Sequence, residues 1–315
     1  MDPPPRNRPR RWLVLTLKIA LALLLVWYIR GTIVEAWQGL GEHRWQLHFG
    51  WLVLAGVCYV VAALLCGLFW HRILRQFDQQ VELLPALRAY FIGHLGKYVP
   101  GKAMVVILRA GLIRGPGVEP SLAVVSVFLE TLTMMSVGAL MAAGVVVVWF
   151  PMQPLLFWSA MGMLLVAGLP TLPPVMRRLA RLAFFGRVGP VVVSKLQRVG
   201  YRTALLGWLL NTLGWAILGV SLWAVMRSLG AETSVGDWMR LTGAVALATV
   251  AGFVSFLPGG AVVREAVLAE MLAPGVGSAL ALVSAILLRL VWLGAELAIS
   301  SILMMVPRAK RESPR

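Results

Sequence analysis

The chain has 315 residues, of which 59% are hydrophobic and 13% are charged, and its mean hydropathy is +0.82. Globular proteins are about 25% charged, so the composition excludes a soluble enzyme, a disordered chain and a collagen-like chain. Lysine and arginine outnumber the acids 29 to 13, which gives a net charge of +16. Because cytoplasmic loops of membrane proteins collect basic residues next to anionic lipids, we expect no nucleic-acid partner.

Long apolar segments predict a helical membrane protein, because about 20 apolar residues are needed to cross a bilayer as a helix. A single membrane domain, residues 12–306, is expected between two basic tails, residues 1–11 and 307–315. Within it, residues 175–202 carry seven cations and no acid, which is typical of a cytoplasmic loop. The six predicted spans are 12–28, 50–70, 120–149, 155–172, 203–228 and 278–306.

One apolar segment, residues 83–113, is interrupted and does not fit a single span. Gly96, Pro100 and Gly101 break it in the middle, and proline lacks the amide hydrogen that a continuous helix needs. Each half rises roughly 16–20 Å, which reaches the middle of a bilayer core of about 30 Å but does not cross it. We therefore predict a re-entrant helical hairpin with its tip at the midplane.

A second segment, residues 238–273, repeats this plan and is broken at Pro258-Gly259-Gly260. When the basic segments are assigned to the cytoplasm, both termini lie there and the two hairpins enter from opposite faces. Broken helices in two inverted halves are typical of a transport site. The alternative is that 238–257 crosses completely, which leaves the C-terminal cations outside. The predicted fold is all-α and polytopic, with about six full spans and two re-entrant hairpins in an inverted repeat.

Charged residues within these apolar segments are the candidates for function, because a charge at the bilayer centre is costly unless it faces a cavity or a partner. The broken helices also free backbone amides, and a helix N-terminus attracts anions. We predict a midplane cavity that receives a lipid phosphate, with carboxylates that hold its cations when it is empty or carry protons. The predicted phosphate ligands are Lys97, Lys102, Arg109, Arg264 and Arg289, and the carboxylates are Glu130, Glu265 and Glu296.

The same charges have a structural interpretation, in which they only pair, for example Arg289 with Glu130, and lock the bundle. His94 lies two residues before the first break and either relays protons or only hydrogen-bonds between helices. Arg114 and the basic residues of 177–202 are expected to contact the lipid surface.

Several other motifs lack the chemistry that their spacing suggests. Residues 96–102, GKYVPGK, match a phosphate-binding loop in spacing, but Ala103 stands where that loop needs Ser or Thr. Cys58 and Cys66 are eight residues apart in one helix, about 12 Å, which is too far for a disulfide. His43 and His48 have no further ligand at metal-binding spacing. We therefore expect no nucleotide, metal or cofactor, and no enzymatic activity.

The two breaks also carry a family resemblance. GHLGKYVPGKAMVVILR and FLPGGAVVREAVL resemble the two signatures of the flippase-like family built on the transmembrane region of lysylphosphatidylglycerol synthases. Val262 departs from that pattern where the family usually has glycine, and Leu108 does so where a glycine often precedes the arginine. Carried over by position, the resemblance implies Lys97, Arg109, Arg264 and Glu265, with the hairpin tips at Gly96, Tyr98, Pro100, Gly101, Pro258, Gly259 and Gly260.

The resemblance implies translocation of an anionic phospholipid or a polyprenyl-phosphate-linked precursor across the bacterial inner membrane, downhill or coupled to an ion gradient. Anionic membrane lipids are then the expected partners. The full synthases add a soluble aminoacyltransferase domain, which we do not expect here because the chain ends about nine residues after the last predicted span. The alternatives are an integral membrane enzyme or accessory subunit in lipid headgroup modification, and a purely structural scaffold.

Overall fold

The computed structural model describes residues 47–99, 103–149, 158, 162, 168–183, 190–255 and 257–305. Within these ranges the chain is helical and contains no strand. Four of the described helices are, by their length and composition, able to cross a membrane, as in a multi-pass membrane protein. They are α3 (Phe49–Gln76), α6 (Pro120–Trp149), α10 (Tyr201–Ser228) and α13 (Ser278–Met305).

These helices correspond to the predicted spans at 50–70, 120–149, 203–228 and 278–306. The predicted span 12–28, most of 155–172 and both basic tails lie outside the described residues. α3 continues six residues past its predicted end at Trp70. It does so because Trp70, Ile73 and Leu74 recur at helical spacing and are all buried.

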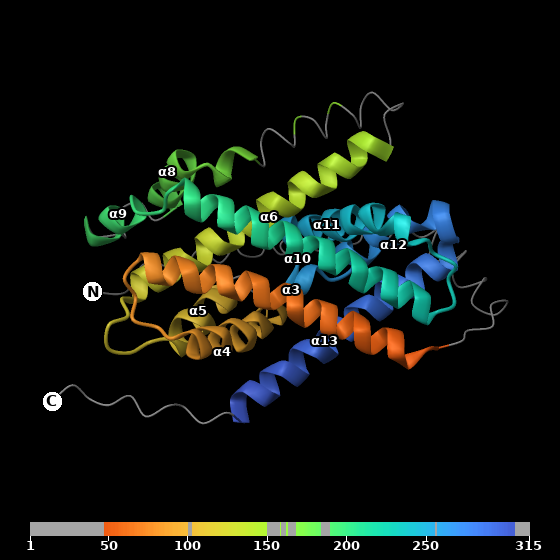
Figure 1. The fold of residues 1–315 in the computed structure, drawn as a ribbon, viewed down its shortest axis with the longest axis horizontal. Helices are drawn as coiled ribbons and strands as arrows, with labels where there is room; N and C mark the ends of the chain where they lie inside the picture. Colours follow the sequence, from red (N-terminus) through yellow and green to blue (C-terminus); the bar gives the residue numbers. More distant parts are fainter. Residues whose placement is uncertain are drawn as a thin grey trace, which may run out of the picture.

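The long helices α3 and α10 are antiparallel (Figure 1). The His48 amide, just before α3, donates a hydrogen bond of 2.9 Å to the carbonyl oxygen of Ser228 at the end of α10. The two interrupted segments therefore begin at opposite ends of the bundle. α4 (Leu83–His94) follows the end of α3, whereas α11 (Trp238–Val254) follows the end of α10.

The first interrupted segment folds as two short helices that pack against each other. α4 leads into the 3-10 turn η1 (Leu95–Tyr98), and α5 (Ala103–Leu112) returns alongside it. Gly96 permits the close approach, since a Cβ atom there would lie 2.8 Å from the backbone nitrogen of Val105. Pro100, Gly101 and Lys102, which complete the predicted tip, lie outside the described residues.

The second interrupted segment has the same plan: α11, the turn η4 (Pro258–Gly260) and α12 (Val263–Val276). Gly259 and Gly260 have φ angles of 58° and 66°, in the left-handed region that glycine tolerates. α12 does not stop at the predicted Ala273-Pro274 but continues to Val276. A proline in the last turn removes only one helical hydrogen bond, which explains why the helix tolerates Pro274.

Val262 also has a left-handed backbone, with a φ of 70°, although it is β-branched. It is the position at which the sequence departs from the glycine of the resembling family. We expect Val262→Gly to raise the free energy of unfolding by about 1 kcal/mol. The left-handed conformation costs an L-residue roughly 1–2 kcal/mol, and the variant avoids this cost. Glycine also loses more conformational entropy on folding, which offsets part of the gain in stability. Thermal unfolding in detergent measures the change. The control Val267→Gly, within α12, should lower stability, and an equal loss in both variants would show that Val262 is unstrained.

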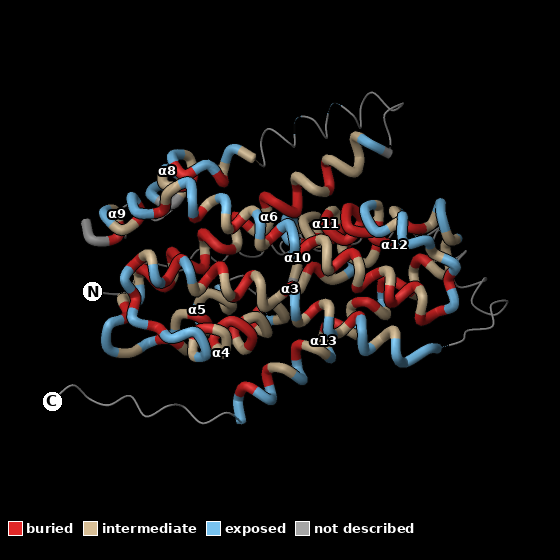
Figure 2. The backbone as a smooth tube through the Cα atoms, in the orientation of Figure 1, coloured by how far each residue is buried: buried red, intermediate tan, exposed pale blue. Residues whose placement is uncertain are grey.

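The buried core lies where α3, α10, α11 and α13 meet, and the helix ends are more exposed (Figure 2). Trp215, Leu222 and Leu288 are among its fully buried side chains. Cys58 and Cys66 are both free, as the spacing predicts.

The segment 175–202, predicted as a basic loop, contains two helices, α8 (Pro173–Ala183) and α9 (Pro190–Leu196). α8 places arginines on one face while Leu182 on another is 68% exposed, a pattern typical of helices that lie in a membrane interface. The sequence could not separate this from a loop, because α8 is short and its two prolines stand at its start, where proline is tolerated. Arg187 lies outside the described residues.

Asp78, in the turn after α3, forms ion pairs with Lys195 and Arg198 at the end of α9. The hydrogen bond from Lys195, with the nearby charge of Arg198, lowers the pKa of the Asp78 carboxyl. An aspartate whose pKa is lowered on folding stabilises the protein while it is ionised. This contribution is therefore fully present at neutral pH, begins to decline below the ordinary aspartate pKa of about 3.9, and is lost as the pH falls through the lowered folded-state pKa.

We therefore expect Asp78→Asn to unfold at a lower temperature than the wild type at pH 7, with the difference shrinking as the pH falls below about 3.9 and vanishing once the pH is below the lowered folded-state pKa. Thermal unfolding of both proteins across this range is the measurement. Because the pair is exposed, the difference should also shrink in high salt. A difference that stays constant as the pH is lowered through the acid range would show that the carboxylate charge is not its cause.

Candidate functional site

The two helix breaks meet inside the bundle. The turns η1 and η4 are in contact, and a Cβ atom on Gly259 would lie 3.2 Å from the Tyr98 ring and 3.1 Å from Nη2 of Arg289. A cavity of about 630 Å³ lies beside this contact, lined largely by apolar side chains of α5, α6 and α11. Its charged lining residues are Lys97, Arg109, Glu130, Arg264 and Arg289.

Arg109 of α5 and Glu130 of α6 form the most buried ion pair. Arg109 Nη1 lies 2.7 Å from Glu130 Oε2, and the two side chains are 2% and 1% exposed. The Tyr90 hydroxyl donates to Glu130 Oε1 at 3.2 Å, and the Tyr90 ring lies 3.9 Å from the centre of the guanidinium. A buried pair held by additional hydrogen bonds has its charges compensated within the protein.

Lys97 of η1 pairs with Glu296 of α13, and the Tyr59 hydroxyl of α3 donates to the same carboxylate oxygen. His94 lies between this pair and the first. Its Nδ1 is 3.2 Å from Arg109 Nη2 and its Nε2 is 3.9 Å from Glu296. Because arginine is always a donor, Nδ1 accepts that hydrogen bond and the ring hydrogen of neutral His94 is assigned to Nε2, facing Glu296.

Arg289 of α13 pairs with Glu265 of α12. The example pair of the structural interpretation, Arg289 with Glu130, is therefore wrong, although these charges do pair with other partners. The reason is geometric, since Glu130 is taken by Arg109 from the neighbouring hairpin. Arg289 and Glu296 share one face of α13, as their spacing predicts, yet each finds its partner on a different element.

Arg264 differs from the other three cations. Within the described part of the chain it makes no ion pair, and its Nη2 is buried without a hydrogen-bond partner. Its guanidinium lies 4.3 Å from the Trp292 ring, which stabilises a cation without neutralising it. Arg264 is thus the cation of this cavity that a further anion can satisfy.

The structure brings four of the five predicted cations to one cavity, together with three carboxylates that each hold one of them. Lys102, the fifth, lies outside the described residues. Their binding of a lipid phosphate remains a prediction.

Three aromatic residues that were not predicted from the sequence, Tyr59, Tyr90 and Trp292, also contact these charges. Trp292 could have been found, because it shares one face of α13 with Arg289 and Glu296. Tyr59 gave no local signal, since Glu296 is 237 residues away.

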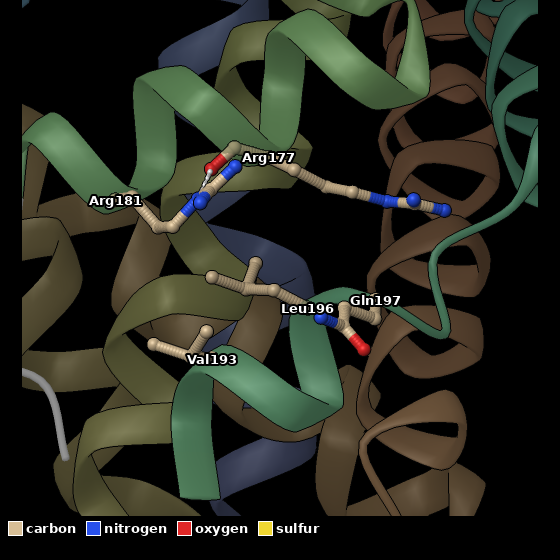
Figure 3. Close-up of a pocket in the computed structure, with 5 residues that line it drawn as sticks. All are labelled: Arg177, Arg181, Val193, Leu196 and Gln197. Carbon is tan, nitrogen blue, oxygen red and sulfur yellow. Dashed lines mark hydrogen bonds between the residues drawn. The ribbon is translucent and has the colours of Figure 1, made fainter. Parts of the chain in front are cut away.

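A second cavity, of about 400 Å³, lies between α8 and α9 and is lined by Arg177, Arg181, Val193, Leu196 and Gln197 (Figure 3). Arg177 donates to the carbonyl oxygen of Val199 at 2.8 Å, which ties α8 to the end of α9. Among the described residues, no group of three or more His, Cys, Asp or Glu side chains is arranged to hold a metal ion.

The family model described as the lysylphosphatidylglycerol synthase TM region matches residues 15–299 of the chain. The matched region includes both helix breaks, the three ion pairs and Arg264. A search of the curated proteins finds no match.

Proposed function

The chain belongs to the family of the lysylphosphatidylglycerol synthase TM region, and from this premise we propose that it is a flippase-like lipid transporter. Its substrate is an anionic phospholipid or a polyprenyl-phosphate-linked precursor, which crosses the bacterial inner membrane through the cavity between the two breaks. Transport proceeds without covalent chemistry on the lipid. The family supports a membrane function related to lipids, and the substrate and the transport itself are our proposal.

The observation that carries the proposal is the charge of Arg264, which pairs with no carboxylate of the described residues, in a largely apolar cavity. A buried, uncompensated cation is costly, and a purely structural cluster would be expected to neutralise it. A lipid phosphate would supply the missing charge, while acyl or prenyl chains would contact the apolar lining. The volume of about 630 Å³ suits a headgroup and the first part of its chains.

The re-entrant character of the hairpins is part of the proposal. α4–α5 and α11–α12 begin at opposite ends of the bundle, and their breaks lie against each other. An inverted pair of broken helices around one site allows each face of the membrane to open to it in turn. The cavity would then be reached alternately from the two leaflets.

The charge distribution supports a cytoplasmic location for one end of the bundle. The end of α3, α8, α9 and the start of α10 are gathered at this end and carry Arg75, Arg178, Lys195 and Arg202. The described loop at the other end, residues 229–237, carries Glu232 and Asp237 and no cation. By the positive-inside rule, α13, which ends near α4 at the basic end, would bring the C-terminus to the cytoplasm.

Leaflet exchange in proteoliposomes tests the proposal. Fluorescent phosphatidylglycerol and phosphatidylcholine are followed separately by adding a quencher that reaches only the outer leaflet. We expect the protein to accelerate exchange of the anionic lipid and not of the zwitterionic one. If folded protein accelerates neither phosphatidylglycerol nor polyprenyl-phosphate lipids in either direction, transport is refuted.

A further inference from the structure

We infer that the cavity selects a lipid phosphodiester that carries one negative charge, over phosphomonoesters and pyrophosphates. This inference rests on the proposed function and narrows its substrate class. It follows from the number of charges in the cavity and from the way in which they are paired.

The described charges around the cavity leave one positive charge uncompensated. Four cations are present, Lys97, Arg109, Arg264 and Arg289, and three of them are held by carboxylates. Each of the three pairs has a direct contact between its charged groups, although Arg109 Nε and Glu296 Oε2 are buried without a partner of their own. The cation that no described carboxylate holds is Arg264, whose buried Nη2 has no hydrogen-bond partner.

The excess of one positive charge is energetically important because of the side chains that surround it. The lining of the cavity is largely apolar, and a net charge in such surroundings is far more costly than one in water. One phosphodiester charge would bring the described cavity to neutrality. A phosphomonoester carries about −1.5 to −2 at pH 7, so it would leave excess negative charge or have to break an existing ion pair.

The geometry of Arg264 fits the same ligand. Its guanidinium lies over the Trp292 ring, 4.3 Å from the ring centre, a contact that restrains a planar group in a way that a flexible lysine ammonium would not share. Arginine presents two parallel N–H groups to two oxygens of one phosphate. A phosphodiester has two free oxygens that can accept them.

The pairing also predicts how the selectivity could be changed. Glu265→Gln removes the partner of Arg289 without removing a cation, so the described cavity then has two uncompensated positive charges. Glu265 is suitable because it is partly accessible, with 14% side-chain exposure, unlike Glu130 with 1%. Glu232→Gln is the matched control, because it makes the same change in net charge on an exposed loop.

The experiment compares four lipids in leaflet exchange: phosphatidylglycerol, phosphatidic acid, a polyprenyl phosphate esterified to a sugar, and a polyprenyl monophosphate. We expect the wild type and Glu232→Gln to exchange the two diesters about tenfold faster than the two monoesters, and Glu265→Gln to reduce or reverse that preference. The two diesters separate a glycerol lipid from a prenyl lipid as the substrate.

Three results would overturn the inference. The first is equal exchange rates for monoesters and diesters in the wild type, and the second is an unchanged lipid preference in Glu265→Gln. The third is loss of diester exchange in Lys102→Gln, because it would mean that Lys102 is a second unpaired cation of the site. In each case exchange of an anionic lipid in the wild type would leave the proposed function standing. Absence of exchange for all four lipids would refute the proposed function, and the inference with it.

Discussion

Arg264→Gln is expected to slow leaflet exchange of phosphatidylglycerol at least tenfold while the protein stays folded. The variant removes the uncompensated charge of the cavity, and hydrogen bonds to a charged group contribute about 1.5–3 kcal/mol, which corresponds to roughly 10- to 150-fold in affinity. Folding should be retained because Arg264 makes no ion pair within the described part of the chain. The dequenching rate in proteoliposomes and the thermal unfolding temperature in detergent are measured on the same preparation.

The control for this experiment is Arg114→Gln, which removes the same charge from an exposed position outside the cavity. Arg264→Lys separates charge from shape, since lysine keeps the charge but loses the planar, two-pronged contact. We expect Arg114→Gln to be as fast as the wild type and Arg264→Lys to be intermediate. Full exchange activity in folded Arg264→Gln would contradict the role assigned to this residue.

Glu130→Gln is expected to destabilise the protein by about 3–5 kcal/mol, because it leaves the guanidinium of Arg109 buried and unpaired. Arg109 is only 2% exposed. The free energy of unfolding, or the yield of folded protein in detergent if unfolding is irreversible, reports the loss. Glu82→Gln, which changes the same residue type at an exposed position, should be nearly neutral.

The double variant Arg109→Met, Glu130→Leu distinguishes loss of a partner from loss of a contact. Replacing both members of a buried ion pair with apolar residues is often neutral or stabilising, so stability should return. The losses of stability in the single variants Arg109→Met and Glu130→Leu, added together, would then greatly exceed the loss in the double variant. A double variant as unstable as Glu130→Gln would indicate that packing around Tyr90, rather than charge pairing, determines the loss.

The sequence allowed the long helices and both interruptions to be predicted because each has a local signal. Continuous apolar runs identify α3, α6, α10 and α13, and proline with glycine identifies the two breaks. The sequence left open whether 175–202 forms a loop or a surface helix, because the short helices α8 and α9 there depend on contacts with distant segments, such as Asp78 with Lys195.

The candidate site was predictable as a set of residues but not as a network. An intramembrane charge is conspicuous in any apolar segment, and for that reason Arg109, Glu130 and Arg264 could be selected from the sequence. Which cation pairs with which carboxylate depends on the packing of α5, α6, α12 and α13. The unpaired state of Arg264, on which the functional argument depends, therefore became visible only in three dimensions.

Photocrosslinking from within the cavity tests the central claim most directly. A benzophenone side chain replaces Met135, which lines the cavity, or Leu205, which is 73% exposed on α10, in vesicles that contain a minority of phosphatidylglycerol in phosphatidylcholine. Mass spectrometry of the adducts should show phosphatidylglycerol enriched over its bulk fraction at position 135 only, and the enrichment should be lost when Arg264→Gln is added. Adducts that match the bulk lipid composition at both positions would contradict an anionic-lipid site in the cavity.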